Sequence, residues 1–371
     1  MRDRVTFRGG THVDMPLLLV VMAIITLGLV NLYSATSVYV DSVRQASLAD
    51  IYVSQIYWIV VGTILAILAA AIDYRFFERL ANLVYLAGLV ALGLVFITGG
   101  HIRGARRWIE IGSFQFQPSE FMKIVVILVV AKILHNDPKT EPRTLLDLAK
   151  PALVIAIPFG AVMAQPDLGT ALIILLTACS MIAMTKIRRS SLLTLFSAVG
   201  IAVPLAWQYV LRPYQKARVT SFMNPELDKS GTGWHALQSQ TAVGNGQLFG
   251  EGFMQGTQNQ FGFMPDQYSD FPFAVFAEDW GFVGSLVLLS LYCFAVIWAI
   301  HVASQAKDRF GAALAIGVGA MVFWHSFFNV GMATGLLPVV GITLPLFSYG
   351  GSNVVTMLIG FGLLMNVSMR R

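Results

Sequence analysis

About ten long apolar runs divide this chain, and they constrain its fold more than any other feature of the sequence. Each approaches the ~20 residues that carry a helix across a ~30 Å hydrocarbon core. Only 12% of the residues are charged, about half the share found in a soluble domain. Because a lipid-facing backbone must satisfy its own hydrogen bonds, the sequence predicts an all-α, polytopic integral membrane protein. We place the spans at roughly 15–36, 51–72, 80–98, 118–134, 149–164, 168–185, 191–210, 271–299, 310–334 and 350–368.

The runs follow one another with no stretch typical of a soluble domain. We therefore expect a single transmembrane domain over residues 1–371, with one long loop at about 211–270 before the eighth span. The first apolar run is too long for a signal-peptide core, so we expect an uncleaved first helix. The sequence contains neither a GxxxxGK[ST] loop for a nucleotide nor an HExxH zinc motif. The net charge of +5 follows the membrane loops, so we expect no nucleic-acid partner.

Basic residues sort by side when the loops are alternated from a cytoplasmic N-terminus. Cytoplasmic loops are enriched in Lys and Arg, so this pattern predicts that both termini are cytoplasmic. The residues that fall inside are Arg2, Arg4, Arg8, Arg75, Arg79, Lys139, Arg143, Lys150, Lys186, Arg188, Arg189, Lys307, Arg309, Arg370 and Arg371.

Two outer loops break this pattern. The loop after the third span carries Arg103, Arg106 and Arg107, and the loop at 211–270 carries Arg212, Lys216, Arg218 and Lys229. These cations could face an anionic ligand. The alternative is that long loops cross the membrane regardless of charge.

Carboxylates at the start of the eighth span are the least expected residues in the chain. Asp270 lies at its outer mouth, just before Pro272. It could cap the helix, as Asp often does, or act as a general base at the membrane surface. Glu278 lies more than two turns deeper, where a carboxylate is costly unless it faces a partner or a cavity. Asp279 must point elsewhere, since adjacent helix residues are ~100° apart.

Other ionisable residues lie near the same outer side. Glu120 and Lys123 share one helix face at i,i+3 spacing, so they could form a salt bridge or bind a ligand or metal. Asp167 could cap the sixth helix, and His325 is most simply a core histidine with satisfied partners. Together with Asp270 and the arginine-bearing loops, they indicate one outward-facing polar site of mixed charge.

Long motifs identify the chain as similar to the SEDS family (shape, elongation, division and sporulation). The stretches that carry the resemblance are RRWIEIGSFQFQPSEFMK at 106–123, AQPDLGTA at 164–171, YQKARV at 214–219, GWHALQSQTAVGNGQLFGEGF at 233–253, GTQNQ at 256–260, SDFPFAVFAEDWGFVG at 269–284 and GLLPVVGITLPLFSYGGSN at 335–353. They cover most of the chain from the third span onward, and the LQSQ and GTQ segments resemble the rod-shape branch of the family more than the division branch.

The resemblance implies a function that composition could not. SEDS proteins are peptidoglycan glycosyltransferases that polymerise lipid II at the outer face of the cytoplasmic membrane. They work with a class B penicillin-binding protein and, in elongation, with further membrane proteins. The family's essential aspartate falls on Asp270, although Asp266, Ser269 and Pro272 depart from the usual pattern around it.

For this chemistry Asp270 is the expected general base, which accepts a sugar hydroxyl proton as an inverting attack proceeds. Positive charge must stabilise the departing pyrophosphate, and a divalent cation such as Mg²⁺ or Mn²⁺ could contribute. The alternative function is a lipid II flippase, which would need polar groups through the full membrane depth. The expected substrate-binding residues are Arg106, Arg107, Glu120, Lys123, Asp167, Arg218, Gln238, Ser239 and Glu278.

Overall fold

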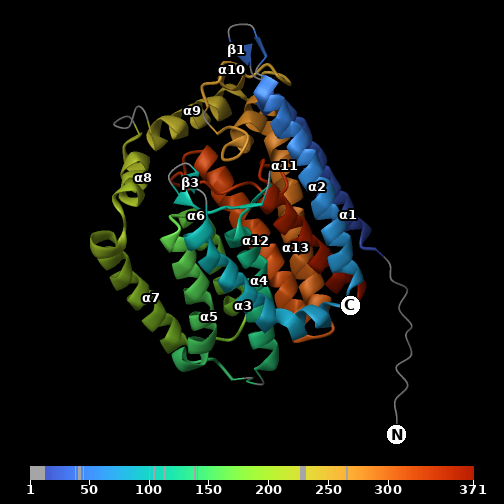
Figure 1. The fold of residues 1–371 in the computed structure, drawn as a ribbon, viewed down its shortest axis with the longest axis vertical. Coiled ribbons are helices and arrows are strands. Elements are labelled where there is room, and N and C mark those ends of the chain that lie inside the picture. The colour runs from blue at the N-terminus through green and yellow to red at the C-terminus, as the bar shows by residue number, and fades with distance from the viewer. Residues whose placement is uncertain are drawn as a thin grey trace.

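A computed structural model shows a bundle of long helices that are roughly parallel and antiparallel to one another (Figure 1). It describes residues 13–37, 39–40, 43–44, 46–99, 101–102, 105–111, 114–137, 139, 141–225, 231–264 and 266–371.

Every predicted span coincides with a helix. The ten helices are α1 (Met15–Thr36), α2 (Ala46–Ala71), α3 (Tyr74–Thr98), α4 (Pro118–Asn136), α5 (Leu145–Ala164), α6 (Leu168–Ala183), α7 (Arg189–Leu205), α11 (Pro272–Gln305), α12 (Arg309–Ala333) and α13 (Gly351–Met369). A π-helical turn, Ala206–Val210, extends α7. Eight of the ten are long and apolar enough to cross a membrane by themselves. The other two are α4, which carries three charged side chains, and α6, which has only 16 residues.

Helices α12 and α13 are mostly buried, and α12 packs against α4, α6 and α11. Small residues permit this close approach, as is usual between membrane helices. A Cβ added at Gly319 of α12 would lie 2.8 Å from the Cβ of Ala299 on α11. Helix α7 is the opposite case, because almost all of its surface is exposed and it stands at the edge of the bundle (Figure 1).

Several connections between the long helices contain short strands or helices. Short antiparallel hairpins join β1 (Tyr39–Val40) to β2 (Val43–Arg44), β3 (His101–Ile102) to β4 (Ala105–Arg106), and β5 (Ile109–Ile111) to β6 (Phe114–Phe116). The long loop predicted at 211–270 contains three helices, which sequence reasoning missed: α8 (Pro213–Met223), α9 (Thr232–Asn245) and α10 (Thr257–Gln260). Helices α9 and α10 lie at one end of the bundle, beside the start of α11, and α8 follows α7 at the edge of the bundle and packs against α9 (Figure 1).

Helix α11 is interrupted at Gly281, whose φ of 66° and ψ of −162° are not helical. The interruption leaves backbone N–H and carbonyl groups of α11 without partners in the helix, and these groups form hydrogen bonds with the glycine-rich segment around residues 246–251. The N–H of Phe282 donates to the carbonyl of Gln247 at 2.9 Å, and the N–H of Glu251 donates to the carbonyl of Glu278 at 2.9 Å. A Cβ at Gly281 would lie 2.3 Å from the nitrogen of Gly250, so only glycine fits this contact.

Candidate active site

Asp270 ends a turn at residues 266–270, directly before α11. Its N–H donates to the carbonyl of Asp266 at 2.9 Å, and its own carbonyl accepts from the Nδ2 of Asn329 on α12 at 2.9 Å. The same Asn329 nitrogen donates to the carbonyl of Ile342 at 2.7 Å. One buried amide therefore ties the Asp270 turn to the loop that follows α12.

The carboxylate of Asp270 is half-buried and faces Gly341 of that loop. A Cβ at Gly341 would lie 3.4 Å from the Oδ2 of Asp270, and its φ of 74° favours glycine. The N-cap position of α11 belongs to Phe271, not to Asp270. Asp270 therefore lies one position before the residue that a simple helix cap would occupy.

Arg218 lies on α8, half-buried beside the ring of Tyr214, with its guanidinium carbon 6.0 Å from the ring centre. Burial, followed by the positive charge of Arg107, lowers the pKa of the Arg218 guanidinium, while Asp270 and Asp167 act in the opposite direction. Residues from four separate segments thus share one electrostatic neighbourhood. These four residues belong to the predicted mixed-charge site, and their contact with a substrate stays a prediction.

Arg107 and Asp167 are held together within that cluster. The guanidinium of Arg107 lies 3.9 Å from the Oδ1 of Asp167 and also donates to the carbonyls of Gln165, at 3.3 Å, and Pro166. Asp167 accepts from the N–H of Thr170 at 3.3 Å, which confirms that it caps α6. Its Oδ2 accepts from the Nε2 of Gln117 at 3.0 Å. Arg107 is therefore fixed in place by a carboxylate and two carbonyls.

Glu120 and Lys123 form the predicted salt bridge, 2.7 Å long and almost fully buried. The Nζ of Lys123 also lies 2.9 Å from the Nε2 of His325. The Nδ1 of His325 lies 2.9 Å from the carbonyl of Thr343, which can only accept, so we assign the ring proton to Nδ1 and the acceptor role to Nε2. His325 is thus the satisfied core histidine that the sequence predicts.

Glu278 is fully buried in the first part of α11, and its partners belong to the protein. Its two carboxylate oxygens accept from the N–H of Gln258 at 2.8 Å and the N–H of Asn259 at 3.2 Å. Asp279 points away from Glu278, as expected, and accepts from the hydroxyl of Ser34 on α1 at 2.5 Å. These two carboxylates fasten the α10 segment and α1 to the start of α11. A substrate contact by Glu278 stays a prediction.

The remaining predicted residues are less central. Ser239 is buried on α9, and its hydroxyl donates to the carbonyl of Ala333 at 2.9 Å, which joins α9 to the end of α12. Gln238 is half-buried on the same helix. The predicted role of the Arg106 side chain, on β4, and the charge of Lys229 lie outside the described part of the structure.

The described residues contain no group of three or more His, Cys, Asp and Glu side chains that could hold a metal ion. They therefore give no support for a metal site formed by the protein alone. A substrate-bound Mg²⁺ needs only one or two carboxylates beside phosphate oxygens. Asp270 and Asp167 are the carboxylates of this cluster that could contribute such a ligand. The divalent cation stays a prediction.

Two residues at this site were not singled out from the sequence, Asn329 and Gly341. Asn329 could have been found, because a fully buried amide in an apolar run needs partners. The position of Gly341 depends on a loop that returns into the bundle, and no local pattern reveals this.

Comparison with known proteins agrees with this arrangement. A family model described as a cell cycle protein, for FtsW, RodA and SpoVE, matches residues 15–371. This chain belongs to that family. Peptidoglycan glycosyltransferase MrdB of Escherichia coli is 34% identical over 369 residues, covering 100% of this chain and 97% of the relative. Stage V sporulation protein E of Bacillus subtilis is 34% identical over 365 residues, covering 96% of this chain and 97% of the relative.

Solved structures show the same fold. A chain from a study of polymerisation and crosslinking by a peptidoglycan synthase complex aligns with a TM-score of 0.82 at 32% identity, covering 97% of this chain and 98% of its own length. The rod shape determining protein RodA of Thermus thermophilus aligns with a TM-score of 0.69 at 29% identity, covering 97% of both chains. The chain is therefore a multi-pass membrane protein of the FtsW/RodA/SpoVE family.

Proposed function

We propose that this chain is a peptidoglycan glycosyltransferase that polymerises lipid II into β-1,4 glycan strands for cell elongation and rod shape. The observation that carries this proposal is the convergence of Asp270, Arg218, Arg107 and Asp167 from distant segments at one end of the bundle. An inverting transfer from a pyrophosphate donor needs a base for the attacking hydroxyl and positive charge for the leaving group. Asp270 is the base in this set, and the two arginines provide the charge. The names of the family relatives support the same activity.

In this mechanism Asp270 accepts the proton of the attacking sugar hydroxyl. A carboxylate is too weak a base to deprotonate an alcohol beforehand, so the proton moves as the new glycosidic bond forms. The C–O bond to pyrophosphate breaks on the opposite face of the anomeric carbon, which inverts its configuration. Pyrophosphate leaves as a stable anion, so no second carboxyl group is needed to protonate it, unlike in most glycosidases.

Arg107 and Arg218 supply the positive charge for the leaving group. The two guanidinium groups repel each other, and a dianion bound between them would relieve that repulsion. Arg also suits phosphate because it can bond two phosphate oxygens at once. Arg107 is already oriented by Asp167, so little ordering is required when the substrate binds. If Mg²⁺ or Mn²⁺ takes part, Asp270 or Asp167 would hold it, and it would supply further positive charge for the departing pyrophosphate.

The distribution of charge favours an enzyme over a flippase. From residue 310 to residue 324, α12 carries no acidic or basic side chain, and neither α6 nor α13 carries one at all. Ionisable groups in the buried helices therefore gather at their ends. A path for a pyrophosphate headgroup through the whole membrane would need polar groups in the middle.

Polymerisation of labelled lipid II tests the proposal. The chain is purified with its class B penicillin-binding protein, which we propose as its partner, and glycan products are resolved on a gel. We expect Asp270→Asn to lower the rate by about 10²–10⁴-fold, the usual contribution of a general base. Asp266→Asn is the matched control, because it alters a carboxylate in the same turn and Asn tolerates its φ of 50°.

Equal rates for wild type and Asp270→Asn would refute the general-base role. If neither protein makes polymer and lipid II crosses liposome membranes, the flippase is the better assignment.

We also propose that both termini are cytoplasmic and that Asp270 faces outward, as the loop charges predict. A cysteine placed at exposed Phe249, after replacement of Cys179 and Cys293, should react with an impermeant maleimide in intact spheroplasts. A cysteine at exposed Lys186 should react only after the membrane is opened. The reverse pattern would invert the topology.

A further inference from the structure

A cavity with a volume of about 550 Å³ lies at the opposite end of the bundle from Asp270. The ends of α4, α6 and α11 and the start of α12 surround it. The α12 residues that line it run from Arg309 to Ile316, whereas the Asp270 turn is held by Asn329, so at about 1.5 Å per residue the two sites lie roughly 20–30 Å apart along α12. Neither the proposed polymerisation nor its substrate uses this cavity.

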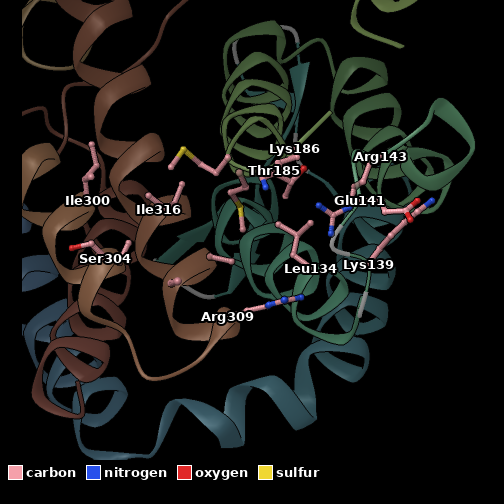
Figure 2. Close-up of a pocket in the computed structure, with 15 residues that line it drawn as sticks. Leu134, Lys139, Glu141, Arg143, Thr185, Lys186, Ile300, Ser304, Arg309 and Ile316 are labelled. Carbon is pink, nitrogen blue, oxygen red and sulfur yellow. The ribbon is translucent and has the colours of Figure 1, made fainter. Parts of the chain in front are cut away.

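The cavity has two chemically different walls. Figure 2 shows Lys139, Arg143 and Lys186 on one side and Ile300 and Ile316 on the other. Its volume lies within the range of about 300–1,000 Å³ that is usual for small-ligand sites. The ligand that matches these walls is an amphiphile with an anionic head.

The basic wall is part of the folded structure. The N–H of Arg143 donates to the carbonyl of Lys186 at 2.8 Å, which joins the two basic segments. The buried guanidinium of Arg143 lies 3.0 Å from the Oδ2 of Asp137, and Lys139 lies 2.6 Å from the carboxylate of Asp147. The N–H of Lys139, followed by Arg143, holds the pKa of Asp137 below its usual value, so this pair stays charged at neutral pH.

Two cations of the cavity have no carboxylate partner among the described residues. The Nη1 of Arg309 donates to the carbonyl of Asp137 at 3.0 Å, and that contact leaves its charge uncompensated. Lys186 is exposed, and the described residues place no acidic side chain against it. Glu141 is the one carboxylate among the lining residues, so the cavity keeps an excess of positive charge.

We propose that this cavity binds an anionic phospholipid, with the headgroup phosphate at Lys186 and Arg309 and an acyl chain along the wall formed by Ile300, Ala313 and Ile316. A soluble anion would have no use for the apolar wall, and a zwitterionic lipid would bring no net charge to the cations. With the topology proposed above, the lipid belongs to the inner leaflet. The binding itself does not depend on that topology or on the polymerase activity.

Native mass spectrometry of the full chain in mild detergent tests the proposal. Phosphatidylglycerol and phosphatidylcholine are added in equal amounts, and we expect phosphatidylglycerol to bind at least about fivefold more tightly. Each cation near an anionic lipid contributes about fivefold in affinity. Lys186→Gln combined with Arg309→Gln should therefore weaken phosphatidylglycerol binding by about 25-fold. Lys150→Gln, on the exposed surface of α5 and away from the cavity, is the matched control and should change it less than twofold.

A second variant keeps every charge. Ala313→Phe fills the apolar wall and should also lower phosphatidylglycerol binding, with an unchanged Tm as the test of folding. Equal binding of the two lipids, or unchanged binding in the double variant, would overturn the proposal. Glycerol phosphate that competes as well as intact phosphatidylglycerol would overturn it too, because the site would then serve a soluble anion.

Discussion

The buried group formed by Glu120, Lys123 and His325 makes a prediction whose size follows from its contacts. Glu120 has three donors: Lys123 at 2.7 Å, the Nδ2 of Asn353 at 2.8 Å and the hydroxyl of Thr170 at 3.4 Å. Among the described residues Lys123 has two partners, Glu120 and His325, and its side chain is fully enclosed. Lys123 therefore depends on Glu120 for its only counter-charge, whereas Glu120 keeps two other hydrogen-bond donors when Lys123 is removed.

Replacement of Glu120 should cost more than replacement of Lys123. Glu120→Leu leaves a buried ammonium group without a counter-charge, which lowers the free energy of unfolding by about 3–5 kcal/mol. Lys123→Met leaves a carboxylate that still has two donors, which costs about 1–3 kcal/mol. The double variant removes both charges and leaves mainly the Asn353 amide unsatisfied, at about 1–2 kcal/mol. The coupling between the two sites should thus be about 2 kcal/mol or more.

Reversible unfolding by SDS in mixed micelles, followed by tryptophan fluorescence, measures these free energies. Lys132→Met, nearer the other end of the same helix, is the control, since a surface substitution usually changes stability by about 0.5 kcal/mol or less. The reasoning fails if the two single changes add within about 0.5 kcal/mol in the double variant. It also fails if Lys123→Met is the more damaging single change.

Three further predictions follow from single contacts. Arg107→Ala should lower the rate of lipid II polymerisation by about 10²–10³-fold, and Arg107→Lys should recover little of it, because Lys cannot bond a carboxylate and phosphate oxygens through a planar fork. Glu278→Gln should lower the free energy of unfolding by about 1–3 kcal/mol and speed limited proteolysis near residues 257–260, whereas a lost rate without lost stability would place Glu278 at the substrate. Gly281→Ala should lower the free energy of unfolding by more than about 2 kcal/mol, since it adds a close contact to an unfavourable φ, and full stability of this variant in the SDS assay would contradict the observed kink.

The helices could be predicted from the sequence because lipid leaves the backbone few alternatives. All ten apolar runs became helices, and most ends lie within a few residues of the prediction. The larger errors occur where polar residues open a helix. Helix α3 begins at Tyr74 instead of residue 80, because Asp73 caps it by accepting from the N–H of Arg75 at 2.9 Å. A hydropathy profile does not reveal a polar residue that caps a helix, so the start of α3 was predicted too late.

The site could be predicted only in part. The sequence placed Asp270, Arg107, Arg218 and Asp167 on one side of the membrane, since loop position alone decides that. It could not tell which carboxylates face the substrate region and which hold the fold together. Glu278 and Asp279 turn out to fasten α10 and α1, and that distinction depends on contacts between segments far apart in the chain.

The stretch of α12 between Arg309 and His325 also bears on the energetics of the cell. Its 15 residues without an acidic or basic side chain, at about 1.5 Å each, form an apolar plug roughly 22 Å thick. With the proposed topology, protons that reach the Lys123–His325 pair from the outer face therefore meet no acidic or basic side chain along this part of α12 that would carry them inward. Polymerisation would then be driven by the pyrophosphate bond of its own substrate, and the enzyme could work in an energised membrane without draining the proton gradient.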